Sequence, residues 1–228
     1  MRNYVTPTVG DLYDTIDERP LAEMKRQHYG QDWLGYAPRY ITGKSFIRLI
    51  QLRIGKLAIL ENTNRGREAD KKCRKCHRVN ESLNHILSNC HYTHFARMQR
   101  HDGVAKLFTG ACEESGHRVL WEPHLLVGNQ LHKPDLVVVD SSTNTSWVID
   151  FSIVTERQFF EGNMTTLNDI WQTKHDKYDT PAIDEHVSTL SVRGIWCSRN
   201  DNILKELSVS KHTRELIVVR AMKMGVKA

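Results

Sequence analysis

Two aspartates flank the most strand-like segments of the sequence. Asp135 opens the run PDLVVV and Asp150 closes the run WVID, and both runs are rich in β-branched and aromatic residues. The polar segment SSTNTS lies between them, which predicts an antiparallel hairpin with both aspartates at the same end of a sheet. Pro134 cannot donate to a ladder, so it places Asp135 at the strand edge. Two converging carboxylates repel unless they share a proton or a cation, so the pair indicates a divalent metal site.

A downstream helix carries two lysines that can complete such a centre. Its predicted apolar face is formed by Phe160, Met164, Leu167 and Trp171. Lys174 and Lys177 lie one turn apart near its C-terminal end, which Pro181 closes. If the helix packs across the sheet, one of these ammonium groups reaches the carboxylate pair. Glu122, in the segment LWEP, is a candidate further ligand, either directly or through water.

This combination fits phosphodiester hydrolysis. A metal held by two carboxylates lowers the pKa of a bound water and neutralises phosphate charge, and a lysine orients that water or stabilises developing negative charge. The alternative is that Asp135 and Asp150 are ordinary strand-end carboxylates and that the lysines belong to a solvated helix end. The ordered set of Pro-Asp, Asp and Lys on a hairpin and a helix favours the metal site.

Three cysteines and a histidine have the spacing of a zinc site. The segment CRKCHRVNESLNHILSNC contains Cys73, Cys76, His85 and Cys90. The first pair is separated by two residues and the second by four, so each pair can face one ion and together they complete a tetrahedron. Four ligands leave no open position, which predicts a structural zinc ion. The fourth ligand is open to three other histidines: His77, His91 and His94.

The residues around this cluster are strongly basic. A charge run is usually a solvated face, but one that surrounds metal-binding cysteines favours phosphate binding. Arg97 and Arg100 are three residues apart, so on a helix they share a face and can grip phosphates together. The predicted nucleic-acid-binding residues are Arg65, Arg67, Lys71, Lys72, Arg74, Lys75, Arg97, Arg100 and His101.

The predicted helices and strands around these groups indicate an α/β chain. The chain has 228 residues, of which 39% are hydrophobic and 26% charged, with a net charge of +5 that is compatible with nucleic acid. No apolar run is long enough to span a bilayer, and no secretory signal is present, so we expect a reducing compartment in which Cys112 and Cys197 are core residues. The segment GKSFIRLIQLRIGKLAIL predicts an amphipathic helix with a basic face, in a linker to an upstream domain outside this chain.

We therefore expect three regions. Residues 1–68 form a helical linker, residues 69–101 a zinc knuckle and residues 102–228 a core with a small mixed sheet, in which TLSVRGIWC is a later strand covered by helices from Asn202 and His212.

The ordered motifs resemble a known family. The segments IQLRIGKLAILENTNRGR, CRKC to HILSNC with ARMQRHD, LHKPDLVVVD, VIDFSIVTE and KHDKYDTP resemble the C-terminal part of the Pol polyprotein of site-specific non-LTR (type-1) retrotransposable elements that insert into ribosomal RNA genes. The resemblance implies a CCHC knuckle and a PD-(D/E)-x-K restriction-endonuclease-like core. Asp135 and Asp150 would be its catalytic carboxylates, with Lys174 or Lys177 as its lysine. Ser152 stands where the common motif has that lysine.

The resemblance also implies a function. The expected activity is Mg²⁺- or Mn²⁺-dependent nicking of double-stranded DNA in the nucleus, in a ribosomal RNA gene, which primes reverse transcription of the element RNA. The reverse transcriptase itself would lie upstream, outside this chain. Two rival hypotheses remain open. One is a nucleic-acid-binding module with a degenerate nuclease core, and the other is a polymerase accessory region that acts only in the complete protein.

Overall fold

A four-stranded mixed sheet lies at the centre of the computed structural model, which describes residues 33–127, 129–155, 158–160, 163–165, 167–178, 185–191 and 193–225. The strand order is β1 (Arg118–Trp121), β4 (Leu136–Asp140), β5 (Thr145–Val154), β8 (Glu185–Ser191). β1, β4 and β5 are antiparallel neighbours, whereas β8 runs parallel to β5. A parallel neighbour needs a crossover connection, and helix α6 (Leu167–Tyr178) lies within it. The predicted mixed α/β architecture is confirmed.

The predicted hairpin is β4 and β5, joined by a turn over residues 141–144. The Asp140 carboxylate accepts hydrogen bonds from the Ser142 and Thr143 hydroxyl groups at 2.6 and 2.9 Å. These bonds lower the pKa of Asp140 to about 2. A short polar side chain that bonds its own backbone region stabilises the turn, which explains why this hairpin was readable from the sequence.

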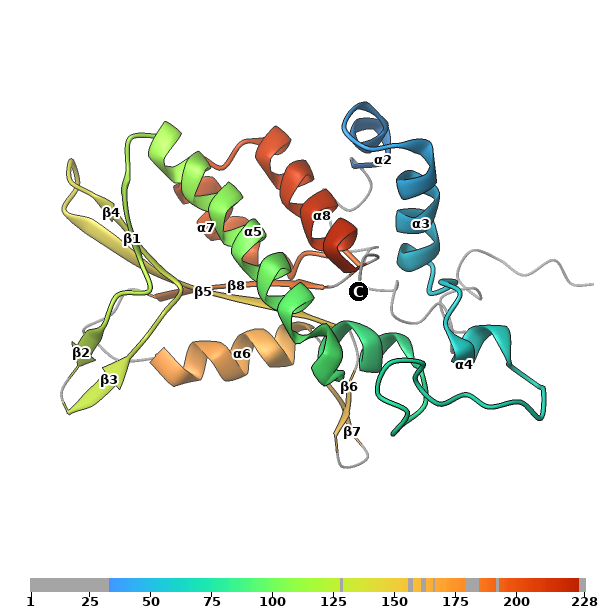
Figure 1. Cartoon of the computed structure of the whole chain (residues 1–228). Helices are drawn as coiled ribbons and strands as arrows, with labels where there is room; N and C mark the ends of the chain where they lie inside the picture. Colours follow the sequence, from blue (N-terminus) through green and yellow to red (C-terminus); the bar gives the residue numbers. More distant parts are fainter. Residues whose placement is uncertain are drawn as a thin grey trace, which may run out of the picture.

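Helices cover both faces of the sheet (Figure 1). α5 (His94–Glu114), α7 (Asp201–Glu206) and α8 (Lys211–Gly225) lie on one side, and α6 lies on the other. α5 packs on α8, where Gly103 lets the two helices approach because a Cβ there would meet the Arg220 side chain at 2.3 Å. Two small hairpins form separate two-stranded sheets. They are β2 (Leu125–Val127) with β3 (Gln130–His132), and β6 (Gln158–Phe160) with β7 (Asn163–Thr165).

Two sequence predictions are wrong in detail. α6 begins at Leu167, so Phe160 and Met164 lie on strands β6 and β7 and not on its face. β6 and β7 pair antiparallel here, and a pair of strands satisfies the backbone as well as a helix would. The later strand spans Glu185–Ser191, so only the start of TLSVRGIWC lies on it, although Leu190 bridges to Trp196. The predicted helix stop at Pro181 lies outside the described residues.

The N-terminal region is helical and packs on the core. It comprises α2 (Trp33–Tyr36), the 3₁₀ turn η2 (Ala37–Arg39), α3 (Gly43–Arg53) and α4 (Leu60–Thr63). Thr42 caps α3 by accepting from the Ser45 N–H at 3.3 Å, and Gly55, with φ of 69°, follows its end. Ile54 and Leu57 therefore lie beyond the helix. Arg53 is buried and donates to the Arg193 carbonyl at 2.6 Å, so it is not on the solvated basic face.

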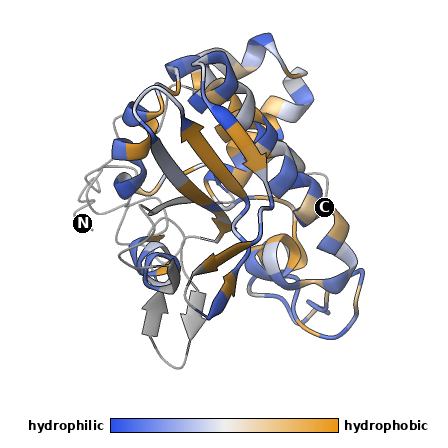
Figure 2. Cartoon of the chain, turned by 90° about the vertical axis from the view of Figure 1, so that its left-hand side faces the viewer, coloured by the Kyte–Doolittle hydropathy of each residue, from blue (hydrophilic) through white to orange (hydrophobic). Residues whose placement is uncertain are grey.

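One hydrophobic core joins these regions. It includes Trp33 and Leu49 from the N-terminal helices, Leu87 from the cysteine-rich region, and Phe108 and Ile149 from the helix and strand that follow. Figure 2 shows hydrophobic residues gathered on the central strands, with hydrophilic ones on the outer helices. Among the described helices, none is both long and apolar enough to cross a membrane. The boundaries 1–68, 69–101 and 102–228 stay a prediction.

Candidate functional site

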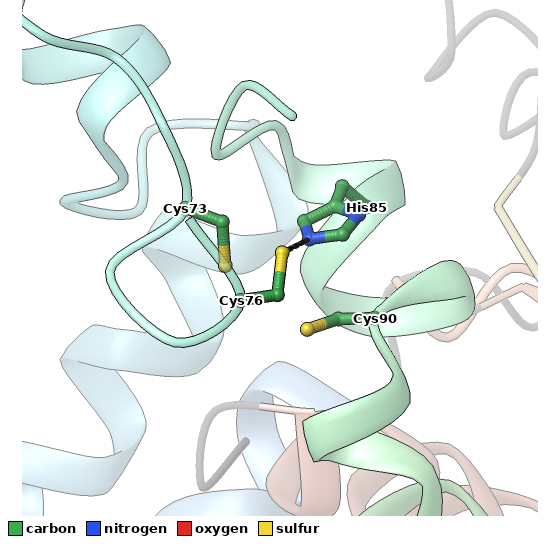
Figure 3. A group of neighbouring side chains, drawn as sticks. All are labelled: Cys73, Cys76, His85 and Cys90. Atoms are coloured by element: carbon green, nitrogen blue, oxygen red, sulfur yellow. Dashed lines mark hydrogen bonds between the residues drawn. The ribbon is translucent and has the colours of Figure 1, made fainter. Parts of the chain in front are cut away.

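The four predicted zinc ligands converge on one point (Figure 3). The ligand atoms of Cys73, Cys76, His85 and Cys90 all lie within 4.8 Å of one another, and Cys76 Sγ is 3.2 Å from His85 Nε2. A tight turn brings the first two thiols together. In this turn the His77 N–H donates to the Cys73 carbonyl at 2.8 Å, with His77 itself at φ of 55°. The second pair lies at either end of the π-helical turn η3 (His85–Asn89).

This donor set fits a structural zinc ion. Tetrahedral zinc with bonds of about 2.3 Å places its ligands roughly 3.8 Å apart, close to the spacing here. Backbone hydrogen bonding from Arg78 lowers the pKa of the Cys76 thiol, and burial lowers the pKa of His85, so the neutral imidazole that a metal needs is favoured. Among the four candidate histidines it is His85 that joins the cluster. Cys112 and Cys197 are buried in the core as predicted, and burial raises the pKa of Cys112 to about 12.

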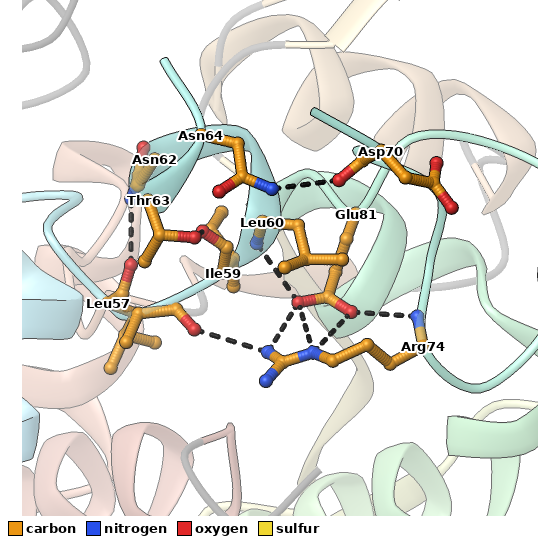
Figure 4. A network of polar contacts seen from close by, with 10 residues as sticks. Leu57, Ile59, Leu60, Asn62, Thr63, Asn64, Asp70, Arg74 and Glu81 are labelled. Atoms are coloured by element: carbon orange, nitrogen blue, oxygen red, sulfur yellow. Dashed lines mark hydrogen bonds and ion pairs between the residues drawn. The ribbon is translucent and has the colours of Figure 1, made fainter. Parts of the chain in front are cut away.

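A buried carboxylate anchors the cluster to the N-terminal helices (Figure 4). Glu81 is 1% exposed, and its carboxylate accepts from the Leu60 N–H at 3.1 Å and the Arg74 N–H at 2.9 Å. The Arg74 guanidinium also pairs with it and donates to the Ala58 carbonyl at 3.1 Å. Burial raises the pKa of Glu81, but these donors outweigh it and leave that pKa lowered. Arg74 is thus partly committed to structure.

Helix α5 holds the cluster from the other side. Arg97 Nη1 donates to the Cys90 carbonyl at 2.6 Å, and Arg100 Nη2 donates to the Leu87 carbonyl at 3.0 Å. Arg100 is 3% exposed, and burial lowers its pKa to about 10. The expectation that Arg100 presents its guanidinium at the surface beside Arg97 is therefore wrong. The π-helical turn leaves carbonyl groups that need donors, and a buried arginine supplies one.

Three acidic residues lie on or directly next to the neighbouring strands β1, β4 and β5, and we call Glu122, Asp135 and Asp150 the carboxylate row. Asp135 precedes β4 in the register that pairs Leu136 with Ile149, so it lies opposite Asp150. On its other side, the Glu122 N–H donates to the Asp135 carbonyl at 2.9 Å and continues the β1–β4 ladder. Asp135 Oδ2 accepts from the Phe151 N–H at 2.6 Å. The predicted convergence of Asp135 and Asp150 is confirmed, and Glu122 is joined to Asp135 through its backbone.

Lys174 approaches this row from α6. Its Nζ lies 2.8 Å from Asp150 Oδ1, and Asp150 is 6% exposed. A carboxylate this buried requires a positive partner, and the ammonium supplies it here. The side chain of Lys177 lies outside the described part of the chain. The expectation that a lysine of this helix reaches the carboxylates is thus met by Lys174.

His101 also belongs to this site, which sequence reasoning placed among the nucleic-acid-binding residues. His101 Nε2 lies 3.1 Å from Asp135 Oδ2, and Nδ1 lies 3.3 Å from Asp102 Oδ1. The hydrogen bond to Asp135 raises the pKa of His101. Burial raises the pKa of Asp135, but His101 and the Phe151 N–H outweigh that effect and lower it. No local signal could show this contact, because 34 residues separate the two side chains.

A groove of about 560 Å³ lies beside both sites and is lined by neighbours of each, not by the four cysteine-cluster residues or by Asp135, Asp150 or Lys174. His94, Arg97 and Met98 line it near the cysteine cluster, and His101 and Glu122 line it near the carboxylates. Glu122 is exposed and adopts a left-handed backbone with φ of 42°, which a non-glycine residue rarely adopts. The other residues predicted to bind nucleic acid come earlier in the sequence, and all of them are at least partly exposed. They are Arg65, Arg67, Lys71, Lys72, Arg74 and Lys75.

Comparisons with known proteins place the chain. No family model matches the sequence. The chain is 32% identical, over 93% of its length, to the retrovirus-related Pol polyprotein from type-2 retrotransposable element R2DM of Drosophila melanogaster. It is 34% identical, over 91% of its length, to a retrovirus-related Pol polyprotein from type-1 retrotransposable element R2 of Popillia japonica. The similarity to the corresponding polyprotein of Nasonia vitripennis is 26% identity over 88% of the chain.

The chain spans only part of these relatives, namely 21% of the Drosophila protein, 48% of the Popillia protein and 20% of the Nasonia protein. The matches nevertheless cover nearly the whole chain, including both the cysteine and histidine cluster and the carboxylate row. Over about nine-tenths of its length, the chain is therefore homologous to a segment of the Pol polyproteins of R2 non-LTR retrotransposable elements.

Proposed function

We propose that this chain is a metal-dependent DNA endonuclease with a PD-(D/E)-x-K-like core. The observation that carries the proposal is the pairing of Asp135 and Asp150 across the hairpin, with Lys174 Nζ at 2.8 Å from Asp150. Oxygen donors from two carboxylates suit a hard cation such as Mg²⁺ or Mn²⁺. Pro134 and Asp135 directly precede β4, Asp150 lies on β5, and the lysine comes from α6 and not from position 152, an order that supports this proposal.

Each of these residues would have its own role in phosphodiester cleavage. Asp135 and Asp150 hold the cation, and Glu122 is placed to contribute through a water from the same row. A bound Mg²⁺ or Mn²⁺ would lower the pKa of a water and neutralise charge on the scissile phosphate. Lys174 orients that water or stabilises charge that develops on the phosphate. His101 and the Phe151 N–H fix the orientation of the Asp135 carboxylate.

The zinc knuckle and its basic flank would hold nucleic acid. Their exposed lysines and arginines suit a phosphate backbone, and the groove is lined by Arg97 beside the knuckle and by His101 beside Asp135. In the wider polyprotein, we propose that the nuclease nicks double-stranded DNA of a ribosomal RNA gene in the nucleus. The exposed 3′ end would prime an upstream reverse transcriptase that copies the element RNA.

The main rival is a nucleic-acid-binding module whose carboxylates only stabilise the fold. Its supporting observation is that Asp150 is already neutralised by Lys174 and that Asp135 is already bonded to His101. On this reading both pairs are structural. A third possibility, an accessory region of the polymerase, predicts that the isolated chain neither cuts nor binds DNA selectively.

Nicking of supercoiled plasmid DNA separates these readings. The zinc-loaded chain is expected to nick with Mg²⁺ or Mn²⁺ at low salt, and Asp150→Ala of equal zinc content is expected to lose this activity. Lys106→Met removes an exposed lysine of α5 outside the row and serves as the control, which is expected to nick normally. If the parent binds DNA but never cuts, the binding-module reading replaces the nuclease.

A further inference from the structure

Three large apolar side chains are exposed at the start of α5 and in the turn before it. Tyr92, Phe95 and Met98 are 62%, 68% and 47% exposed, and we call them the aromatic strip. They are spaced three residues apart, which keeps Phe95 and Met98 on neighbouring positions of one helical face. The His91 ring packs against Tyr92 with centroids 4.2 Å apart. Large rings that stay exposed in this way indicate a binding surface.

The aromatic strip is continuous with the proposed catalytic groove. Met98 lines that groove together with His94, Arg97 and His101. His101 lies one turn beyond Met98 and contacts Asp135. With a helical rise of about 1.5 Å per residue, Phe95 is about 9 Å along the helix from His101. Whatever binds the strip therefore lies next to the carboxylate row.

The charges beside the strip favour nucleic acid over protein as its occupant. From Cys90 to His101 the chain contains two arginines, of which Arg100 is buried, three histidines and no acidic residue. Arg97 and His94 line the groove beside the rings, whereas the centre of a protein interface is usually depleted of charge. The two exposed rings, Tyr92 and Phe95, with Arg97 beside them, suit a strand whose bases are free to stack and whose phosphates need neutralising.

We propose that the aromatic strip binds unpaired bases of the DNA strand that enters the catalytic groove. In a paired duplex the base faces are covered by their neighbours, so the rings can stack only where the DNA is locally open. At about 3.4 Å per stacked nucleotide, a separation of about 9 Å corresponds to roughly three nucleotides. The preferred substrate is then a duplex with a few unpaired nucleotides within that distance of the cut. This inference rests on the proposed nuclease function for its placement of the cut.

A binding measurement tests the strip without any cleavage. The probes are a fluorescein-labelled mixed-sequence 20-nucleotide strand and the same strand in a perfect duplex, titrated without Mg²⁺. Phe95→Ala is expected to raise the Kd for the single strand by about 5-fold or more, as loss of one stacking ring does, and to change the Kd for the duplex less than about twofold. Ile47→Ala, which removes an equally exposed apolar side chain from α3, is the matched control and is expected to change neither.

Salt dependence separates stacking from charge. Phe95→Ala releases no counterions, so the slope of log Kd against log salt is expected to stay unchanged, whereas Arg97→Gln is expected to reduce it by about 0.7 if that side chain meets a phosphate. Thermal unfolding of each variant checks that the fold is intact. Unchanged single-strand affinity in folded Phe95→Ala and Tyr92→Ala would overturn the proposal and leave the strip as a contact for the rest of the polyprotein.

A cleavage measurement links the strip to the nuclease. Negative supercoiling favours local unpairing, so the parent is expected to nick supercoiled plasmid faster than relaxed closed plasmid, and Phe95→Ala is expected to lose that preference. If the parent fails to nick but the strip variants still weaken single-strand binding, the nuclease proposal fails and the strip stands. If the parent nicks and the variants keep both the preference and the affinity, the strip proposal fails and the nuclease stands.

Discussion

Replacing Lys174 with methionine should destabilise the chain in a way that Mg²⁺ reverses. Lys174 Nζ is 2.8 Å from Asp150, whose carboxylate is almost fully buried. Removing one partner of a buried ion pair costs about 3–5 kcal/mol. Because 31% of the Lys174 side chain is exposed to water, we reduce this to about 1–3 kcal/mol of unfolding free energy. For a chain of this size the expected loss is about 2–12 °C in Tm.

The proposed metal site supplies the second half of this prediction. A cation bound by Asp135 and Asp150 stabilises both proteins, by about 2.7 kcal/mol at 100 times its Kd. Without Lys174 the charge of Asp150 is not neutralised, so the variant should bind the cation more tightly and gain more stability at the same Mg²⁺ concentration. The gap in Tm between parent and variant should therefore narrow when Mg²⁺ is added. Thermal unfolding of zinc-loaded protein with and without Mg²⁺ measures this gap.

Two control variants test whether the loss of stability comes from the Lys174–Asp150 ion pair. Lys106→Met should leave the Tm near that of the parent, because Lys106 is exposed on α5. The double variant Lys174→Met/Asp150→Asn should regain most of the lost stability, because no buried charge is left unpaired. An unchanged Tm in Lys174→Met would show that the ion pair is not formed. A Tm that is lowered in Lys174→Met and does not respond to Mg²⁺ would support the ion pair but contradict the metal site.

Three further predictions concern the knuckle. Cys90→Ser should reduce bound zinc well below about one ion per chain, measured by atomic emission, and lower the Tm, whereas an unaltered zinc content would exclude this ligand. Glu81→Gln should cost about 1–3 kcal/mol near neutral pH in urea unfolding, because a buried charged acceptor is lost. The pKa of Glu81 is lowered on folding, so its contribution to stability is present above the free value of about 4.3 and is lost as pH falls through the lowered value. The difference in unfolding free energy between Glu81→Gln and the parent should therefore shrink in acid. A difference that does not change with pH would contradict this. Arg100→Gln should cost about 1–3 kcal/mol by unpairing the Leu87 carbonyl, yet leave the salt slope of DNA binding unchanged; a reduced slope would mean that the guanidinium reaches phosphate.

The parts of the fold that were predictable from sequence are those with local causes. The β4–β5 hairpin follows from two strand-like runs around a polar turn, and its register brings Asp135 opposite Asp150 without further information. The cysteine and histidine cluster is likewise encoded in short spacings, and His85 completes it. These features needed no knowledge of what packs against them.

The parts that failed depend on packing between distant segments. An arginine is usually found at the surface, but Arg100 is buried, where it donates a hydrogen bond to the Leu87 carbonyl. His101 pairs with Asp135 only because α5 packs against β1 and β5, on either side of the strand that Asp135 precedes. The periodicity of Phe160 and Met164 suggested a helix, yet the chain forms a short hairpin there, since two short paired strands satisfied the backbone equally well.

Anomalous diffraction from a crystal of this chain soaked in Mn²⁺ would locate the proposed catalytic metal. We expect a manganese peak within roughly 2.5 Å of carboxylate oxygens of both Asp135 and Asp150. A zinc peak among Cys73, Cys76, His85 and Cys90 serves as the internal control. A clear zinc peak with no manganese at the two aspartates, at saturating Mn²⁺, would contradict the claim that they form a catalytic metal site.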